Sequence, residues 1–205
     1  MGIYSEQVLP RIVDVACGLP ANERLRRRVC AGLSDRVVEI GFGSGHNVPY
    51  YPAAVKSVTA VEPADLGWRL AGKRLAQSAV PVQRSGLDGQ SLPFPDNSFD
   101  AALSTWTLCT IPAMATALAE IRRVLVPGGT FHFVEHGLAP DAKVQAWQSR
   151  LNPVQKTLFG GCNLNRDIAA AIEEAGFEVR ELDRFYEEQA PKFLGSQYLG
   201  LAVSP

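Results

Sequence analysis

The segment "VVEIGFGSGHNVPYYP", residues 37–52, contains three glycines at alternate positions directly after a run of strand-forming residues. Glycine has no β-carbon, so it permits unusual backbone angles and lets a ligand approach the main chain. A glycine loop at the end of a strand is typical of a nucleotide-binding site. A dinucleotide fingerprint would place glycines at 41, 43 and 46, but this chain has Gly41, Gly43 and Gly45, with His46 next. The spacing therefore indicates a different nucleotide ligand.

Two acidic residues follow the next strand-like segments. Glu62 comes after Gly41 at close to the spacing of about 20 residues expected of a carboxylate that binds a ribose diol. A carboxylate there repels a 2′-phosphate, which argues against NADP. Asp88 follows the third strand-like segment and is placed to accept a hydrogen bond from an exocyclic amine such as adenine N6. Ligands bind beyond the carboxyl ends of parallel strands, so these residues together predict a nucleoside site.

Strand-like and helix-like segments alternate along the chain. This order predicts an α/β, Rossmann-like fold, in which a seven-stranded and mostly parallel sheet has helices on both faces. Strands are expected over 36–40, 57–61, 80–83, 99–105, 130–136, 177–185 and 198–204. Helices are expected over 5–16, 21–31, 64–77, 113–125, 141–151 and 165–175.

The end of the chain departs from this alternation. Two strands that close a chain often form an antiparallel hairpin, so the last strand is expected to be antiparallel. We expect residues 1–205 to form a single domain, in which the helices of residues 1–34 cover the cofactor site. The segment 184–197, which contains Pro191, is predicted to be a substrate loop.

The composition excludes several classes of protein. Of the 205 residues, 46% are hydrophobic and 20% are charged, which is typical of a soluble globular domain. The net charge of −1 argues against nucleic-acid binding, because such proteins usually carry a basic face. No stretch approaches the length of about 18 apolar residues needed for a membrane span. The cysteines show no metal-ligand spacing and suit a reduced, cytoplasmic protein; they are Cys17, Cys30, Cys109 and Cys162.

The motifs "VVEIGFGSG", "VEP", "LDGQSLPFPDNSFD" and "EIRRVLVPGGTFHFVEH" occur in this order within residues 36–136. They resemble the consecutive motifs of class I S-adenosylmethionine-dependent methyltransferases. The resemblance implies a seven-stranded sheet with an antiparallel last strand, and S-adenosylmethionine as the cofactor. It also implies contacts with the methionine part from Glu39, Gly41, Gly43 and Gly45, with the ribose from Glu62, and with adenine from Leu87 and Asp88. The expected cofactor site further includes His46, Asn47, Pro63, Ser104 and Thr105.

Four segments, "GSGHNVPYYP", "TWTLCTI", "VEH" and "GCNLNRD", extend this similarity. They resemble the methyltransferase-like 7 branch of the family, whose members methylate alkyl thiols. The resemblance implies a small, fairly apolar acceptor such as a thiol. The eukaryotic members of that branch carry an N-terminal membrane anchor, and we expect no such segment here.

Methyl transfer from a sulfonium is an in-line displacement, in which the protein mainly aligns the reacting atoms and excludes water. His136, together with Glu135, is predicted to be the catalytic base or an acceptor contact, with a structural hydrogen bond as the alternative. A thiol with a pKa near about 8.5 is already partly ionised, so a base is dispensable. We expect His132 to be a core residue, and Cys109 and Cys162 to be packing residues.

Several side chains have two interpretations that the sequence leaves open. His46 either contacts the carboxylate of the cofactor or caps the following helix. Trp106 forms an apolar wall for the methyl group or packs in the core. Asn163 is expected to cap the helix over 165–175, and Arg166 to anchor its loop.

Two other classes of function serve as alternatives. An NAD-dependent oxidoreductase would need a glycine at 46 and a downstream Tyr/Lys or metal set, and neither is evident. A non-catalytic cofactor-binding module would keep the glycine loop and lack only the acceptor pocket. The expected partner of the enzyme is a small-molecule methyl acceptor, and the sequence leaves the oligomeric state open.

Overall fold

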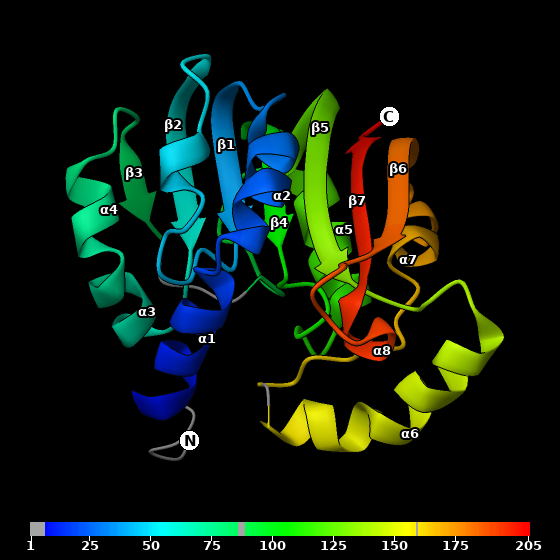
Figure 1. The fold of residues 1–205 in the computed structure, drawn as a ribbon. Helices are drawn as coiled ribbons and strands as arrows, with labels where there is room; N and C mark the ends of the chain where they lie inside the picture. The colour runs from blue at the N-terminus through cyan, green and yellow to red at the C-terminus, as the bar shows by residue number, and fades with distance from the viewer. Residues whose placement is uncertain (1–6, 86–88, 159) are drawn as a thin grey trace.

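The computed structural model describes residues 7–85, 89–158 and 160–205. Its strands form one seven-stranded sheet in the order β3-β2-β1-β4-β5-β7-β6 (Figure 1). The first five strands are parallel, and β7 runs antiparallel to both of its neighbours, which confirms the predicted fold. The strands are β1 (Asp35–Ile40), β2 (Val55–Val61), β3 (Val82–Arg84), β4 (Phe99–Thr105), β5 (Leu125–His136), β6 (Glu178–Tyr186) and β7 (Ser196–Val203).

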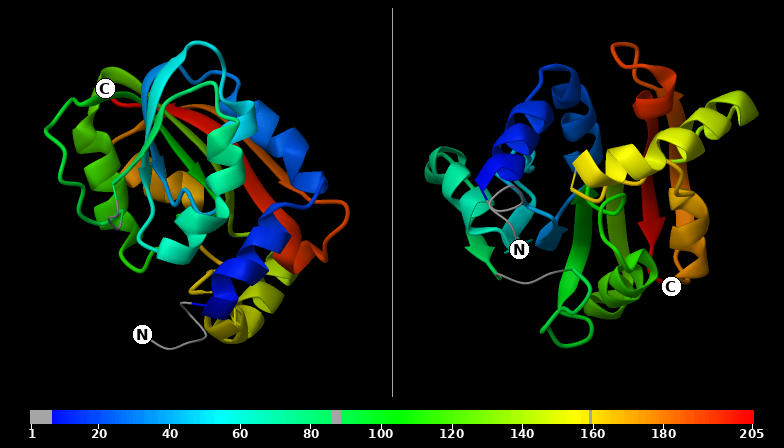
Figure 2. Two further views of the ribbon diagram at one scale, coloured as in Figure 1. Left: turned by 90° about the vertical axis from the view of Figure 1, so that its left-hand side faces the viewer. Right: turned by 90° about the horizontal axis from the view of Figure 1, so that it is seen from below.

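Helices cover both faces of the sheet. Figure 2 shows α2 on one face and α5 and α7 on the other. The helices are α1 (Leu9–Cys17), α2 (Ala21–Cys30), α3 (Asp65–Leu70), α4 (Gly72–Ala76), α5 (Met114–Val124), α6 (Ala142–Leu158), α7 (Ile168–Glu174) and α8 (Lys192–Gly195). The helix predicted over 64–77 is therefore two short helices, and α6 continues well beyond residue 151, where it was predicted to end.

The pattern of buried residues in β1, β5 and α5 matches the secondary structure of each element. The last four residues of β1 are all buried, as expected of a central parallel strand that is covered on both faces. In β5, Phe131 and Phe133 face the core shared with α5 and α7, while Val134 faces the core shared with α2. On α5 the buried residues recur at helical spacing, so one stripe of that helix packs on the sheet.

The strand β5 begins earlier than expected. Phe99 of β4 pairs with Leu125 and Ala101 pairs with Thr130, so the residues between the two partners form a bulge. Gly128 in this bulge has a φ of 77°, a conformation that favours glycine. The helix α5 ends at Val124, one residue before the predicted end, and the segment "VPGGT" that follows is part of the strand.

Two helices lie beside the carboxyl ends of the parallel strands. In Figure 1, α1 and α6 lie below the sheet, at the edge toward which β1, β2, β4 and β5 point. The predicted substrate loop over 184–197 contains the end of β6, α8 and the start of β7. Within the ranges that the structure describes, no helix has the length and apolar character needed to cross a membrane.

The loop before α7 corrects one prediction. Asp167, and not Asn163, is the N-cap of this helix, and its side chain accepts a hydrogen bond from the Ala170 N–H. The helix begins three residues later than expected, at Ile168, which leaves Asn163 in the preceding loop. There its side-chain amide donates to the carbonyl oxygens of Cys109 and Gly161.

This cap predicts the effect of two substitutions on stability. Asp167→Ala removes the acceptor for the Ala170 N–H and should lower the free energy of unfolding by about 1 kcal/mol. Asp167→Asn keeps a side-chain oxygen at the cap and should retain most of the stability. Urea unfolding followed by circular dichroism measures both. Equal losses in the two variants would contradict the assignment of the cap.

Candidate active site

The glycine loop, residues 41–47, turns sharply at the end of β1. Gly41, Gly43 and Gly45 have φ angles of 72°, 58° and 77°, so each lies in the left-handed region. A β-carbon at Gly41 would lie 2.1 Å from Oγ1 of Thr107, because the loop packs against the end of β4. A β-carbon at Gly43 would meet only the Gly41 carbonyl oxygen, at 4.0 Å. The backbone at Gly43 is thus left open for a ligand to approach.

Glu62 lies directly after β2 and faces the same loop. One of its carboxylate oxygens accepts a hydrogen bond from the Gly43 N–H at 2.7 Å, and the other accepts from the Ala64 N–H at 2.7 Å. Its burial raises the pKa of the carboxyl group, and the two backbone donors oppose this shift. The structure therefore brings the glycine loop and the acidic residue together, and each oxygen retains a lone pair for a further donor.

A buried polar network lies under the glycine loop. The Asn47 side-chain amide donates to Glu39 at 2.9 Å and to the Thr105 hydroxyl at 3.0 Å. The Tyr51 hydroxyl donates to the other oxygen of Glu39, and Arg26 donates to the Asn47 side-chain carbonyl. Burial raises the pKa of Glu39 to about 7, against the effect of its hydrogen bonds. Glu39, Asn47 and Thr105 were predicted to contact the cofactor; their polar atoms bond to one another and to Tyr51 and Arg26, and the cofactor contacts stay predictions.

His46 has a partner that neither predicted role includes. Its Nε2 lies 2.9 Å from Oδ1 of Asp14, on α1, and 3.0 Å from the Asp14 carbonyl oxygen. Ser44 and Arg74 donate to the same carboxylate oxygen. These contacts tie α1 to the glycine loop. The short helix that follows, Val48–Tyr50, has no side-chain cap, so His46 does not cap it, and its contact with the carboxylate of the cofactor stays a prediction. Its burial, with the charges of Arg74 and Arg26 adding, lowers the pKa of the imidazole.

A cavity of about 430 Å³, which we call the main cavity because it adjoins the glycine loop, opens beside that loop. It is bounded by α1, the glycine loop, the end of β2, the segment after β4, the end of β5 and the loop before α7. Each of these contributes a lining residue, in this order: Val13, Gly43, Glu62, Trp106, His136 and Cys162. Pro63 also lines it. A second cavity of about 350 Å³ has charged walls that include Asp14, Arg26 and Arg74, and Cys17 lines both cavities.

The post-β4 loop, residues 106–112, is held by a buried carboxylate. Glu135 is fully buried and accepts hydrogen bonds from the Ser104 hydroxyl at 2.7 Å, the Thr107 N–H at 3.0 Å and the Cys109 N–H at 3.3 Å. Ser104 is also fully buried. Glu135 holds the loop through these backbone donors, and Ser104 holds the carboxylate of Glu135. The catalytic role expected of Glu135 and the cofactor contact expected of Ser104 stay predictions.

Trp106 forms one wall of the main cavity. Its φ of 51° turns the chain out of β4, and its indole N–H donates to the Gln197 side chain at 3.0 Å. The guanidinium carbon of Arg26 lies 4.8 Å from the centroid of the indole ring. The ring of His136 lies 6.4 Å away on the cavity side. These contacts fix the orientation of the indole, which supports the interpretation of Trp106 as a wall.

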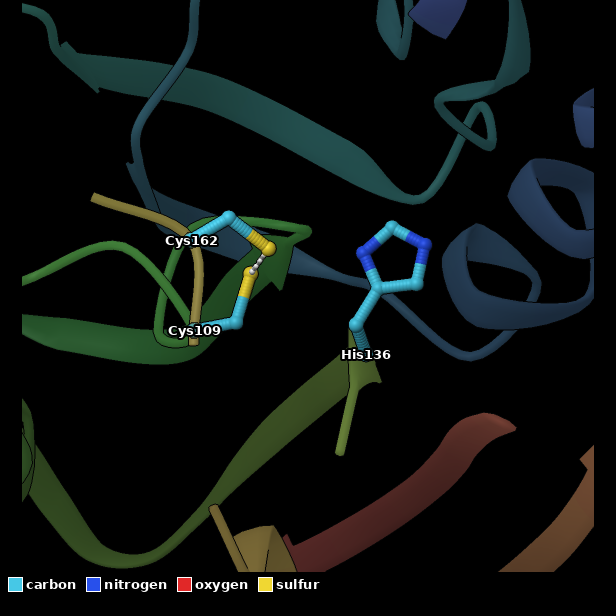
Figure 3. A group of neighbouring side chains, drawn as sticks. All are labelled: Cys109, His136 and Cys162. Carbon is cyan, nitrogen blue, oxygen red and sulfur yellow. Dashed lines mark hydrogen bonds between the residues drawn. The ribbon is translucent and has the colours of Figure 1, made fainter. Parts of the chain in front are cut away.

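His136 lies beside two cysteines that the sequence did not connect with it. We call Cys109, His136 and Cys162 the Cys/His cluster; their potential ligand atoms all lie within 4.8 Å of one another (Figure 3). The two sulfur atoms are 3.7 Å apart. Cys109 and His136 point to the same end of the main cavity as Cys162. Contact with Cys109 and with His136 lowers the pKa of Cys162, and contact with Cys162 together with burial raises the pKa of Cys109.

The remaining predicted residues divide into two groups. Leu87 and Asp88 lie outside the described residues, so their contacts with adenine stay predictions; Gly89, next to them, lines the main cavity. His132 is a core residue, as expected, because its ring nitrogens lie 3.1 Å from the Val29 carbonyl and 3.1 Å from the Thr130 hydroxyl. Burial lowers the pKa of His132 to about 4.

Arg166 anchors the segment that carries Cys162, as predicted. It donates to the carbonyl oxygens of Leu108 and, at 2.7 Å, of Ile111, in the post-β4 loop. The main-chain N–H of Asn163 donates to the Cys109 carbonyl at 2.8 Å. The only sequence signal for the pairing of Cys109 and Cys162 was that both lie in segments that carried the closer resemblance.

Comparisons with known proteins agree with this geometry. The model of the family described as "Methyltransferase domain" matches residues 38–133. Thiol S-methyltransferase TMT1A of Homo sapiens is 33% identical over 207 residues, which cover 98% of this chain and 81% of that protein. Thiol S-methyltransferase TMT1B of Rattus norvegicus is 32% identical, over 84% of this chain and 72% of that protein. The solved structure of 1,6-didemethyltoxoflavin-N1-methyltransferase from Burkholderia thailandensis, with S-adenosylhomocysteine bound, aligns with a TM-score of 0.71 at 18% identity. That alignment covers 95% of this chain and 83% of the other.

The chain therefore belongs to the class I S-adenosylmethionine-dependent methyltransferases, and its cofactor is S-adenosylmethionine. The residues present fit this cofactor on two structural observations. The backbone at Gly43 leaves space where a side chain would intrude, and the Glu62 carboxylate lines the cavity at that point. These findings give no support to the oxidoreductase alternative.

Glu62 provides a direct test of the cofactor site. Glu62→Ala removes the acceptor for the Gly43 N–H and the acceptor predicted for the ribose hydroxyls, and should weaken S-adenosylmethionine binding about 10-fold to 100-fold. Glu62→Gln keeps one acceptor oxygen and should lose less. Isothermal titration calorimetry measures both dissociation constants. An unchanged affinity in Glu62→Ala would contradict the placement of Glu62 in the cofactor site.

The buried carboxyl of Glu39 predicts a dependence of stability on pH. Its pKa of about 7 in the folded state lies above its ordinary value of 4.5, so ionisation favours the unfolded chain. The contribution of Glu39 to stability is complete below about pH 4.5 and falls as the pH rises through about 7. Glu39→Gln does not ionise, so the wild type should lose about 3 kcal/mol relative to this variant between about pH 4 and pH 8. Urea unfolding of both proteins across this range measures the difference, and parallel curves would contradict the assignment.

Proposed function

We propose that the methyl acceptor is a small thiol that binds in the main cavity between Trp106 and the Cys/His cluster. The observation that carries the proposal is the continuity of one cavity, which runs from Gly43 and Glu62 at one end to His136 and Cys162 at the other. The walls between these ends come largely from apolar residues such as Val13 and Ile111. This environment suits an uncharged, apolar acceptor better than a phosphorylated or polymeric one. The relatives TMT1A and TMT1B, which are named thiol S-methyltransferases, support the choice of a thiol.

The placement of the cofactor in this cavity is part of the proposal. Gly41, Gly43 and Gly45 hold the methionine part, Glu62 and Pro63 hold the ribose, and Leu87 and Asp88 hold adenine. The charged second cavity, with Arg26 and Asp14 in its walls, receives the amino-acid end of the cofactor. Residues 1–34 form the cover of the site, supported by the contacts of α1 with the glycine loop through Asp14.

The protein's contribution to the reaction is alignment and exclusion of water. When bound, the cofactor supplies an activated methyl group on a sulfonium. The fixed indole of Trp106 and the ordered post-β4 loop limit the orientations of an acceptor, and such positioning contributes up to about 7–11 kcal/mol in favourable cases. His136 contacts the acceptor sulfur from the end of β5. A thiol pKa near about 8.5 leaves a reactive thiolate fraction at neutral pH, so the transfer does not require a buried base.

The proposal also includes the domain organisation of the enzyme and its cellular compartment. We propose one domain over residues 1–205, with residues 184–197 as a substrate loop, supported by the packing of Phe193 and Leu194 against Cys109 and Cys162. We also propose a reducing compartment, the cytoplasm, because cysteines 17, 30, 109 and 162 are free thiols.

The acceptor class is tested with the purified protein and a panel of alkyl thiols, phenols and amines. We expect S-adenosylhomocysteine to form with thiols only, and kcat/KM to rise with pH as the acceptor thiol ionises. Turnover with phenols or amines alone would end the thiol proposal. Tight S-adenosylmethionine binding without turnover of any acceptor would instead favour the non-catalytic module.

A further inference from the structure

Three side chains with soft or borderline donor atoms meet at the acceptor end of the main cavity. Cys109 follows β4, His136 ends β5 and Cys162 lies in the loop before α7, so three separate segments bring them together. Their potential ligand atoms all lie within 4.8 Å of one another, and Figure 3 shows the imidazole of His136 beside the paired sulfurs. Neither the resemblance nor the transfer chemistry described above requires this grouping.

The distance between the two sulfurs matches a metal site. Two thiolates bound to one zinc ion at about 2.3 Å and at the tetrahedral angle lie about 3.8 Å apart. The Cys109 and Cys162 sulfurs are 3.7 Å apart, so a tetrahedral ion would fit between them without displacing either. Sulfur and imidazole nitrogen bound to one tetrahedral zinc ion lie about 3.6 Å apart. All three ligand atoms lie within 4.8 Å of one another, so His136 is near enough to complete the site after a modest shift of its side chain.

The backbone around the cluster holds this geometry in advance. The Cys109 N–H donates to the Glu135 carboxylate at 3.3 Å, and Glu135 precedes His136 in β5. The main-chain N–H of Asn163, next to Cys162, donates to the Cys109 carbonyl at 2.8 Å. Leu164, Phe193 and Leu194 pack against the two cysteines. Outer contacts of this kind orient metal ligands and raise the affinity of a site.

We propose that Cys109, Cys162 and His136 bind one zinc ion, with a fourth coordination position open to the main cavity. Two thiolates and one imidazole are a donor set that zinc prefers, and three protein ligands with one open position are typical of catalytic zinc. The charges also balance, because two thiolates neutralise a divalent cation. A neutral site of this kind is compatible with the surrounding apolar walls.

The open position provides a role for the metal in the proposed reaction. The acceptor thiol replaces water at the fourth position and releases its proton to the solvent, which leaves a metal-bound thiolate. A lone pair of that sulfur forms the new bond to the methyl carbon while the bond from this carbon to the sulfonium sulfur breaks. The products are a thioether, which is an uncharged and weak ligand, and neutral S-adenosylhomocysteine. This role rests on the proposed thiol acceptor, whereas metal binding itself does not.

Metal binding is tested on the reduced full chain after treatment with a chelator. Zinc titration in competition with a chromophoric chelator should show one tight site per chain, and Co²⁺ should give an absorption spectrum with sulfur-to-metal charge transfer and tetrahedral d–d bands. Cys109→Ala and Cys162→Ala should each weaken binding by at least about 100-fold, since even outer contacts contribute 10-fold to 100-fold. Cys30→Ala is the matched control, because Cys30 is equally buried but belongs to the core beside α2, and it should bind metal normally.

S-adenosylmethionine affinity, measured for every variant, reports whether the fold is intact. Absence of tight 1:1 binding, or binding that survives both cysteine substitutions in folded protein, would overturn the metal site and leave thiol methylation untouched. One-to-one binding that requires both cysteines supports the site. Bound zinc without thiol turnover would contradict the proposal that the acceptor is a thiol, and would leave the metal site supported. Equal thiol turnover with and without bound zinc would overturn the catalytic role of the ion.

Discussion

The hydrogen bond between the Gly43 N–H and the Glu62 carboxylate joins the ends of β1 and β2, and the site is built around it. It forms only because the glycine loop folds back through left-handed backbone angles, which bring a main-chain donor to a side chain on the neighbouring strand. The same contact fixes the carboxylate at the edge of the main cavity. The closure of the loop thus sets the position of the Glu62 carboxylate at the cavity.

Two other buried carboxylates, Glu39 and Glu135, hold loops in position. Glu39 holds the underside of the glycine loop through Asn47 and Tyr51, and Glu135 holds the post-β4 loop through backbone N–H groups. Burial raises the pKa of both groups, which is the electrostatic consequence of placing an acid under each loop. The cavity walls are apolar because these polar anchors lie behind them. Rigid apolar walls are what an alignment-dependent transfer requires.

The sequence predicted the sheet, its antiparallel end and the meeting of the glycine loop with Glu62, because these follow from strand alternation and from the position of strand ends. It predicted less well what individual side chains contact. Glu135 and His136 are neighbours in the sequence, but successive residues of a strand point to opposite faces. The Glu135 side chain is therefore buried in the interior, whereas His136 lines the cavity. Cys109 and Cys162 are 53 residues apart, and they meet only because a loop without periodic pattern folds back on Arg166.

We propose that the loop and Glu62 jointly bind the nucleoside of the sulfonium cofactor, with its sulfur directed at the acceptor end of the cavity. A crystal structure of the protein with S-adenosylhomocysteine would test this arrangement. We expect both ribose hydroxyls to lie within hydrogen-bond distance of the Glu62 carboxylate, and the sulfur of the product to face His136 and Trp106. A nucleoside bound away from Glu62, or a sulfur turned from that end of the cavity, would contradict it.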